Sequence, residues 1–293
     1  MDLENIFVPV RAELEEVEIE LAGQLNQISE KAHPHYRGFV KKAVSHLFTV
    51  SGKRLRPALL LLSAKAAGGM ESGVQPPAVI EMASAVELVH SASLIHDDII
   101  DESTERRSRS SLNYEFGNKI AVLVGDLLYS QFFYRLTSLS TDSWQPKQQI
   151  FDIFWNTTEK MCVGEILQQR ILLGQEQADR ESYLDILENK TALLMAASCK
   201  CGGVLTGADD TALQLLWAFG LSFGMAYQLV DDYLDCDTLY LDGTMDELHM
   251  AKEYIAQGKS LLARLPDTPA AASLGKLCDY LVSRVDKRVS TAG

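Results

Sequence analysis

The sequence predicts an all-α protein, a single-domain bundle of helices over residues 1–293. Between Ala78 and Leu265 the only proline is Pro146, and long stretches without a helix breaker favour helices. Apolar residues recur at every third or fourth position, as in the run 120–128. The sustained alternation and the Asn-Gly turns that are typical of β-hairpins are absent from the sequence.

Four polar or glycine-containing segments divide the predicted helices: residues 68–77, 138–146, 202–210 and 237–246. Because these connections are short and the helices between them are long, neighbouring helices are expected to run antiparallel, as in a helix bundle. The sequence contains neither an internal repeat nor a low-complexity tract, which favours one domain over an array of repeats.

The charge of the chain restricts its partners. With 293 residues it can bury roughly three quarters of its unfolded surface, so folding requires no disulfide or metal. Its 27 basic and 40 acidic residues give a net charge of −13. Such an acidic chain is poorly suited to nucleic acid or to an anionic membrane surface. An anionic substrate would therefore need locally concentrated cations or bound metal ions.

Cysteine usage and hydropathy predict a cytoplasmic location. The five cysteines form no CxxC pair, which indicates reduced thiols. The N-terminus lacks the basic start and the apolar run of a signal peptide. No uninterrupted apolar stretch reaches about 18 residues, the length of a membrane span, so no stable membrane insertion is expected.

A basic segment, Ser51–Pro57, precedes an apolar helix. Its glycine, Gly52, suits a turn, and its proline suits the first turn of the helix that follows. Three basic residues crowd this helix start: Lys53, Arg54 and Arg56. Because the N-terminus of a helix attracts anions, the segment predicts an anion site, and an exposed basic loop is the simpler alternative.

The first acidic motif comprises Asp97, Asp98 and Asp101, in the pattern DDxxD. Asp97 and Asp101 are four residues apart and share one face of a helix. An acidic surface patch is one interpretation. However, the preceding stretch 86–94 is largely apolar and indicates a core helix, where unpaired carboxylates are costly. The motif therefore predicts a bound cation.

The DDxxD pattern recurs in a second helix, where Gln228, Asp231, Asp232 and Asp235 form one stripe. Ligands that are all carboxylates select hard cations, of which Mg²⁺ is the one expected. Because Mg²⁺ is usually held by one or two carboxylates together with substrate phosphates, two such stripes predict a metal-clamped diphosphate.

Further polar residues flank the first motif. His90 lies two turns before Asp97 on the same helix face, so it is expected either as a ligand or as a structural side chain. His96 points away from the acidic stripe and is expected in the core. Arg106 and Arg107 follow the motif, and arginine suits bidentate contacts with phosphate.

Taken together, these features resemble the trans-isoprenyl diphosphate synthases of the polyprenyl synthetase family, in particular its medium- and long-chain members. The matching stretches are GKRLRP at 52–57, ELVHSASLIHDDIIDESTERR at 87–107, FGNKIAVLVGD at 116–126, GEILQ at 164–168, NKTALL at 189–194 and GMAYQLVDDYLD at 224–235. Each stretch is moderately specific, and their order makes the combination highly specific.

The resemblance implies helices around a large central cavity, usually in a homodimer, and the head-to-tail joining of an allylic diphosphate to isopentenyl diphosphate. The residues that it assigns to Mg²⁺, as three ions with bound diphosphate, are Asp97, Asp98, Asp101, Asp231, Asp232 and Asp235. Those that it assigns to isopentenyl diphosphate are Lys53, Arg56, His90 and Arg107. It places Arg106 and Lys190 at the allylic diphosphate, and Thr191 and Gln228 along the reacting carbons.

The implied mechanism depends on charge. Mg²⁺, lysine and arginine neutralise the departing diphosphate, so that the allylic C–O bond ionises. The isopentenyl double bond then attacks the cation in an apolar cavity that excludes water, and a proton is lost to the released diphosphate. The mechanism needs no protein nucleophile, and the sequence offers no evident one.

Two small residues bear on product length. Ala92 and Ser93 lie about one turn before the first acidic motif, where short-chain members of the family carry bulky aromatics. Their size predicts an open tunnel and a trans-polyprenyl diphosphate longer than farnesyl, with geranylgeranyl diphosphate as the alternative product. Tyr129, Phe132 and Phe133 on a neighbouring helix are expected to form the floor of the tunnel.

The sequence departs from the family pattern in two places. The family continues after its second motif with a Gly-Lys-rich loop, and a few dozen residues are expected to be missing from this sequence, either as an omitted loop or as a true deletion, after about residue 238. The family's RRGxP reads Arg106-Arg107-Ser108-Arg109-Ser110 here, without its glycine and proline.

Three other classes of protein share some of these features. A class I terpene cyclase has the same fold and first motif, but its second motif normally contains Asn, Ser and Glu in place of Asp231-Asp232-x-x-Asp235. A di-iron carboxylate bundle needs two Glu-x-x-His pairs, and Glu87-x-x-His90 is the only one found. A non-catalytic subunit usually loses its aspartates, whereas this chain retains both sets.

Overall fold

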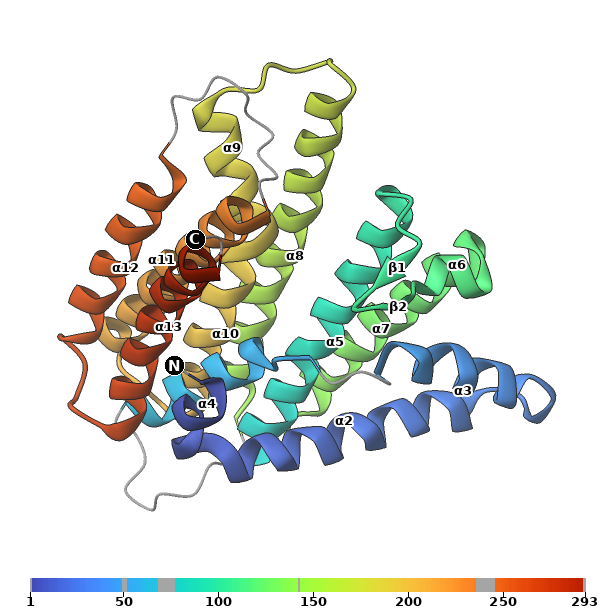
Figure 1. Cartoon of the computed structure of the whole chain (residues 1–293). Coiled ribbons are helices and arrows are strands. Elements are labelled where there is room, and N and C mark those ends of the chain that lie inside the picture. The colour runs from blue at the N-terminus through green and yellow to red at the C-terminus, as the bar shows by residue number, and fades with distance from the viewer. Residues whose placement is uncertain (1, 49–51, 68–76, 142, 236–245, 292–293) are drawn as a thin grey trace. The chain divides into compact units, whose positions relative to one another are not determined.

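The computed structural model describes residues 2–48, 52–67, 77–141, 143–235 and 246–291, and these are almost entirely helical (Figure 1). The predicted all-α fold is thereby confirmed. The chain forms two compact units. The α5 unit comprises Ala12–Ala58 and Pro77–Asp142, and the α11 unit comprises Met1–Arg11, Leu59–Pro76 and Ser143–Gly293. The organisation of residues 1–293 as one domain stays a prediction.

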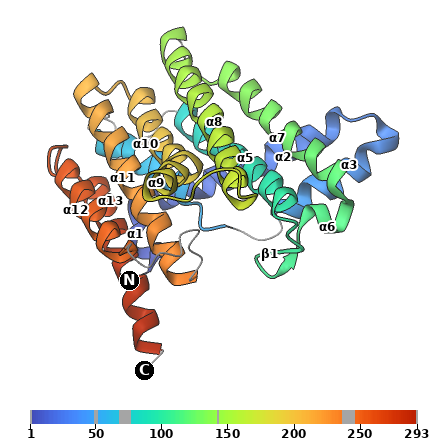
Figure 2. The ribbon, with the colours of Figure 1, turned by 90° about the horizontal axis from the view of Figure 1, so that it is seen from above.

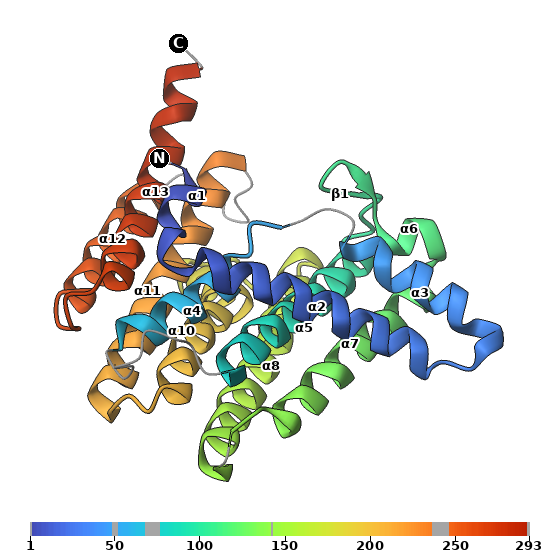
Figure 3. The same cartoon turned by 90° about the horizontal axis from the view of Figure 1, so that it is seen from below.

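The α5 unit contains helices that surround one apolar helix. Its elements are α2 (Arg11–Lys31), α3 (Pro34–Phe48), the start of α4 (Leu55–Ala66), α5 (Pro77–Ile100), β1 (Glu105–Arg106), β2 (Arg109–Ser110), α6 (Leu112–Phe116) and α7 (Asn118–Ser138). α5 packs along α7, and α2 runs across α5 (Figure 1 and Figure 3). Gln24 Nε2 of α2 donates a hydrogen bond of 2.8 Å to Ser84 Oγ of α5.

The α11 unit contains the remaining helices. Its elements are α1 (Leu3–Ile6), η1 (Val8–Val10), the rest of α4, α8 (Trp144–Leu172), α9 (Arg180–Leu187), η2 (Glu188–Ala192), α10 (Leu193–Leu205), α11 (Asp210–Asp235), α12 (Glu247–Leu262) and α13 (Pro269–Thr291). α11 packs between α10 and α12, and α13 contacts both α11 and α12 (Figure 2). Helix η2 is a short stretch of π-helix between α9 and α10.

Helices α5 and α11 are apolar around most of their circumference. Averaged over 18 residues, the hydropathy of each reaches that of a membrane span, although neither contains an uninterrupted apolar stretch of that length. Most of each window, 72% in α5 and 67% in α11, is buried inside the protein. A helix that is hydrophobic all round and packed against other helices on most sides is a core helix, and this accounts for the hydropathy of both.

The predicted breaks agree with the helix ends of the described residues, but the connection between α8 and α9 was not predicted. α4 ends at Ala66, α7 ends at Ser138 and α11 ends at Asp235. The predicted break over 202–210 is confirmed but starts later than expected, because α10 continues to Leu205 before α11 begins at Asp210. A Cβ atom at Gly202 would lie 2.3 Å from the carbonyl oxygen of Leu60, so this glycine serves the close packing of α10 against α4. The segment expected to lack a family loop falls within residues 236–245, outside the described residues.

A short β-hairpin follows α5, where the sequence predicts none. Glu105 pairs with Ser110 and Arg106 pairs with Arg109 in antiparallel register. The two turn residues, Arg107 and Ser108, have φ angles of 52° and 61°. A two-residue turn with both φ angles positive usually carries Asn-Gly, and this is why the pattern of the sequence does not reveal it. Ser108 stands where the RRGxP pattern of the family that the sequence resembles has glycine.

Two glycines, in the stretches GEILQ and GMAYQLVDDYLD, explain how helices approach η2. A Cβ atom at Gly224 of α11 would lie 2.4 Å from the Cα atom of Ala192, and one at Gly164 of α8 would lie 2.7 Å from the Cβ atom of Asn189. Because real side chains do not tolerate such distances, only glycine lets α8 and α11 pack this closely on η2.

Replacing Gly224 by alanine is therefore expected to destabilise the protein. The new methyl group meets backbone rather than a flexible side-chain end, so Gly224→Ala should lower the free energy of unfolding by about 1–3 kcal/mol in urea titrations. The matched control is Gly275→Ala on α13, where a Cβ atom would meet nothing within 4 Å. Equal stabilities of the two variants would contradict the packing argument.

Candidate active site

Three residues of the predicted isopentenyl diphosphate set come together in the α5 unit. Arg56 Nη1 donates a hydrogen bond of 3.0 Å to Nε2 of His90. A Cβ atom at Gly52 would lie 2.8 Å from the guanidinium of Arg107, so this arginine lies directly over the glycine of the basic segment. Lys53 follows Gly52 and is exposed. The segment GKRLRP and the second arginine after the acidic motif therefore meet around His90.

His90 lies in a strongly positive environment. Burial lowers the pKa of His90 well below its ordinary value of 6.5, and the charges of Arg56, Arg107, Arg106 and Arg54 lower it further. The imidazole is therefore neutral at pH 7, consistent with its acceptance of a hydrogen bond from Arg56. Arginines gathered around a neutral side chain create a positive potential that suits an anion. Whether His90 is a ligand or a structural side chain stays a prediction.

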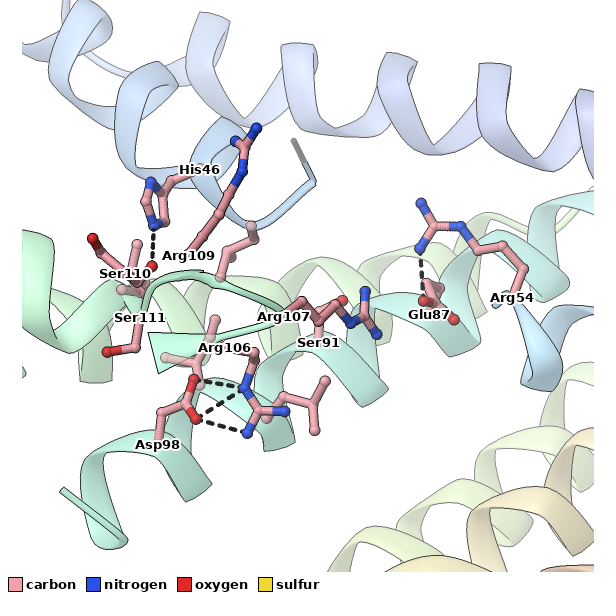
Figure 4. Close-up of a pocket in the computed structure, with 14 residues that line it drawn as sticks. His46, Arg54, Glu87, Ser91, Asp98, Arg106, Arg107, Arg109, Ser110 and Ser111 are labelled. Carbon is pink, nitrogen blue, oxygen red and sulfur yellow. Dashed lines mark hydrogen bonds and ion pairs between the residues drawn. The ribbon is translucent and has the colours of Figure 1, made fainter. Parts of the chain in front are cut away.

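Arg54 has a structural role that the sequence motif does not reveal. Its guanidinium forms an ion pair with Glu18 of α2. It forms a second ion pair, at 2.7 Å, with Glu87 of α5, and Figure 4 shows this second pair. Its backbone has a φ angle of 48°, in the left-handed region. Because two carboxylates neutralise Arg54, it fixes the basic segment to α2 and α5.

The first acidic motif divides into two sets of contacts. Asp98 is buried, and both of its carboxylate oxygens accept hydrogen bonds from Arg106 Nε, at 2.9 and 2.7 Å (Figure 4). Asp97 is half-buried and Asp101 is exposed at the end of α5. Asp98 and Arg106 are thus paired with each other in the structure. The resemblance predicts different partners for them, Mg²⁺ for Asp98 and diphosphate for Arg106.

A pocket of about 640 Å³, which includes its mouth open to solvent, lies between the hairpin and α5 (Figure 4). Arg106, Arg107 and Arg109 line it together with the apolar side chains of Leu94 and Ile95. The pocket therefore combines a cationic edge with an apolar wall.

The predicted catalytic residues of the α11 unit form one hydrogen-bonded chain. Thr191 Oγ1 donates to Gln228 Oε1 at 2.9 Å, and Gln228 Nε2 donates to Asp232 Oδ1 at 2.8 Å. The other oxygen of Asp232 accepts a hydrogen bond of 2.6 Å from the hydroxyl of Tyr183. Sequence reasoning missed Tyr183, because its partner lies 49 positions further along the chain. Each polar atom in this chain is held in one orientation.

Lys190 lies on η2 beside α8. Its ammonium donates a hydrogen bond of 2.8 Å to Gln168 Oε1 and forms an ion pair with Glu165. Both partners belong to the motif GEILQ, so the structure explains why this motif and NKTALL occur together. These two contacts hold the positive charge of Lys190 in place, next to Thr191 on η2.

The chemistry of the two acidic motifs fits divalent cations. Neither α5 nor α11 has a basic residue in its last turn, yet both end in aspartates. Carboxylates at a helix C-terminus oppose the helix dipole, so these ends need positive charge from elsewhere. Their donors are all oxygen, as Mg²⁺ prefers. Within the described residues no three His, Cys, Asp or Glu side chains gather into a closed protein-only metal site.

The residues predicted to control product length lie within the α5 unit. Ala92 is fully buried, and Ser93 Oγ donates a hydrogen bond of 2.9 Å to the carbonyl of His90. On α7, Phe132 is buried and packs against Phe133, with ring centres 5.2 Å apart. Tyr129 stacks on a histidine of α5 at 6.0 Å.

That histidine, His96, is not in the core as predicted. Its side chain is 28% exposed, and its Nε2 lies 3.6 Å from Oδ1 of Asp126. A Cβ atom at Gly125 would lie 2.2 Å from His96 Nε2, so the missing side chain of Gly125 leaves room for the ring at the surface of α7. The helical periodicity of α5 alone does not reveal this space.

The depressed pKa of His90 predicts a pH dependence of stability. In the unfolded chain this histidine binds a proton near pH 6.5, whereas the folded protein resists protonation, so stability should fall as the pH decreases from about 7 to 5. His90→Gln should flatten this dependence in urea titrations at pH 5, 6 and 7. His249→Gln, at an exposed histidine of α12, should leave it unchanged. If His90→Gln keeps the wild-type slope, the proposed environment of His90 is wrong.

Comparison with known proteins identifies the family. Residues 37–240 match the polyprenyl synthetase family. The chain is 37% identical over 233 residues to a prenyl transferase of Cyanophora paradoxa, covering 79% of this chain and 66% of that protein, just under two thirds of its length. It is 30% identical over 295 residues to geranylgeranyl diphosphate synthase of Methanosarcina mazei, covering 83% and 89%.

Among solved structures, a decaprenyl diphosphate synthase from Rhodobacter capsulatus is similar with a TM-score of 0.80 and 25% identity, covering 97% of this chain and 99% of that one. The sequence matches and the shared fold confirm the resemblance predicted from the motifs. The chain belongs to the polyprenyl synthetase family.

Proposed function

We propose that this protein is a Mg²⁺-dependent prenyltransferase that joins isopentenyl diphosphate head to tail to an allylic diphosphate. The observation that carries the proposal is the gathering of Arg56, His90 and Arg107 in a chain whose net charge is −13. A local concentration of cations in so acidic a protein favours a specific anionic substrate. Membership of the polyprenyl synthetase family supports a diphosphate as that anion.

In the α5 unit, we assign the basic group to isopentenyl diphosphate. Arg56 and Arg107 would each contact phosphate oxygens through planar guanidinium groups, and Lys53 would add a mobile positive charge. His90 is neutral and can hydrogen-bond without adding a further charge. Binding of an anion would raise the pKa of His90 again, because it offsets the surrounding arginines.

In the α11 unit, we assign Lys190 to the allylic diphosphate and the Thr191–Gln228 pair to the reacting carbons. Their hydrogen-bonded chain fixes two dipoles before substrate arrives, so they can stabilise positive charge without reorganising. Bound Mg²⁺ would neutralise the charge of the leaving diphosphate. We propose that three Mg²⁺ ions bind with the diphosphate. The side chains proposed as their ligands are Asp97, Asp101, Asp231 and Asp235, with Asp98 and Asp232 assisting.

We propose a product longer than farnesyl diphosphate. Small side chains at Ala92 and Ser93 support this length, as does the structural similarity to a decaprenyl diphosphate synthase. Similarity to a geranylgeranyl diphosphate synthase keeps that product as the second candidate.

We place the reaction in the cytoplasm, in keeping with the free thiols of the described cysteines.

The decisive experiment incubates the protein with Mg²⁺, isopentenyl diphosphate and either geranyl, farnesyl or geranylgeranyl diphosphate, followed by mass spectrometry of the products. The expected products are linear diphosphates longer than farnesyl. A cyclic hydrocarbon would instead indicate a terpene cyclase, and turnover only after a partner is added would indicate a subunit of a larger enzyme.

Ala92→Phe and Ser93→Phe should each shorten the product, whereas Leu123→Phe, at an exposed site of α7, should not. Unchanged lengths in both variants would refute the tunnel.

We also propose that the protein is a homodimer formed through α8. Five exposed side chains follow one line along this helix: Trp144, Phe151, Trp155, Cys162 and Ile166. At 3.6 residues per turn they fall within a sector of about 60°. The four large apolar side chains are between 44% and 64% exposed. Apolar surface of this extent is costly in water, and a second copy of the same helix would cover it.

Substitution on this stripe should dissociate the dimer. Trp155→Glu and Ile166→Glu each place a charge in the proposed apolar contact, and both variants are expected to elute as monomers in size-exclusion chromatography with light scattering. Lys160→Glu, exposed on the opposite side of α8, should remain dimeric. A wild-type protein that is monomeric at micromolar concentration would disprove this interface.

A further inference from the structure

The C-terminal helix supplies a cation to the second acidic motif. Arg284 of α13 lies beside Asp231 of α11, with Nη1 at 2.5 Å from Oδ1. The guanidinium also lies over the ring of Tyr227, 5.6 Å from its centre. The two charged side chains are only 20% and 24% exposed, so their interaction is partly shielded from water and salt.

Asp231 differs from its neighbour in the kind of partner it has. Asp232 accepts hydrogen bonds from the neutral donors Tyr183 and Gln228. Asp231 is instead paired with a full positive charge. Because α11 has no basic residue in its last turn and also carries Asp235 there, Arg284 compensates both the helix dipole and the mutual repulsion of the aspartates.

We infer that Arg284 is an internal counter-ion that occupies Asp231 when no divalent cation is bound, and that a metal ion must compete with it for this carboxylate. The inference rests on the proposed role of Asp231 as a metal ligand. Two cations cannot both lie close to one carboxylate oxygen without repelling each other. The position of Arg284 on α13 would therefore be coupled to metal binding on α11.

The inference makes a prediction with a definite sign. A counter-ion that competes with the metal weakens metal binding, so its removal should strengthen binding. A residue that merely orients a metal ligand would act in the opposite direction, since loss of such support usually weakens metal affinity. The direction of the change therefore separates a competing role from a positioning role.

Mn²⁺ serves as the probe, because its free ion gives an electron paramagnetic resonance signal that disappears on binding. Arg284→Gln should bind Mn²⁺ about fivefold more tightly than the wild type, as expected for removal of one partly screened charge. Arg284→Lys keeps the charge and should bind Mn²⁺ like the wild type. Arg264→Gln removes an exposed charge of the same unit and serves as the matched control.

Thermal melting gives a second readout that does not depend on activity. Without metal, Arg284→Gln should melt at a lower temperature than the wild type, because its aspartates lack their counter-ion. Saturating Mn²⁺ should raise its melting temperature by more than it raises that of the wild type. Unchanged or weaker Mn²⁺ binding in a folded Arg284→Gln variant overturns the inference.

Asp231→Asn separates failure of this inference from failure of the proposed function. If Asp231→Asn weakens Mn²⁺ binding while Arg284→Gln does not strengthen it, Asp231 is a metal ligand and only the competition is refuted. If Asp231→Asn binds Mn²⁺ like the wild type, the proposed metal role of Asp231 falls, and the inference falls with it.

Discussion

Aspartates at the C-terminal ends of apolar helices require positive charge, and the arrangement of polar residues in this protein follows from that requirement. Helices α5 and α11 contribute much of the buried apolar surface, yet each ends in a DDxxD motif where its own dipole opposes carboxylates. Arg106 of the hairpin compensates Asp98, and Arg284 of α13 compensates Asp231. The remaining acidic oxygens have the ligand chemistry that divalent cations prefer.

Around His90 it is positive charge that is concentrated. Burial and the charges of several nearby arginines lower the pKa of this imidazole, so it is neutral. Arg54 is the exception among these arginines, because Glu18 and Glu87 neutralise its charge. These two ion pairs fix the basic segment to α2 and α5. What remains is a concentration of positive charge in a protein of strongly negative net charge, which suits an anion.

Close packing of helices positions the polar residues of the α11 unit. Lys190 and Thr191 lie on a π-helical stretch, and Gly164 and Gly224 let α8 and α11 approach it. Short π-helical stretches within α-helices frequently occur at functional sites, since they reorient side chains relative to a regular helix. Here the stretch turns two neighbouring residues toward different partners: Lys190 toward α8 and Thr191 toward α11.

The sequence by itself determined the helices, most of their boundaries and the residue types of the site, because apolar periodicity, prolines and the spacing of DDxxD are local properties of the chain. It determined neither the hairpin at Arg107-Ser108, whose turn lacks the usual residues, nor the continuation of α10 through Gly202. Only the tertiary structure decided which charges meet, as in Asp231 with Arg284 and Asp232 with Tyr183. Those partners lie about fifty positions apart, and packing between helices, rather than any local pattern, brings them together.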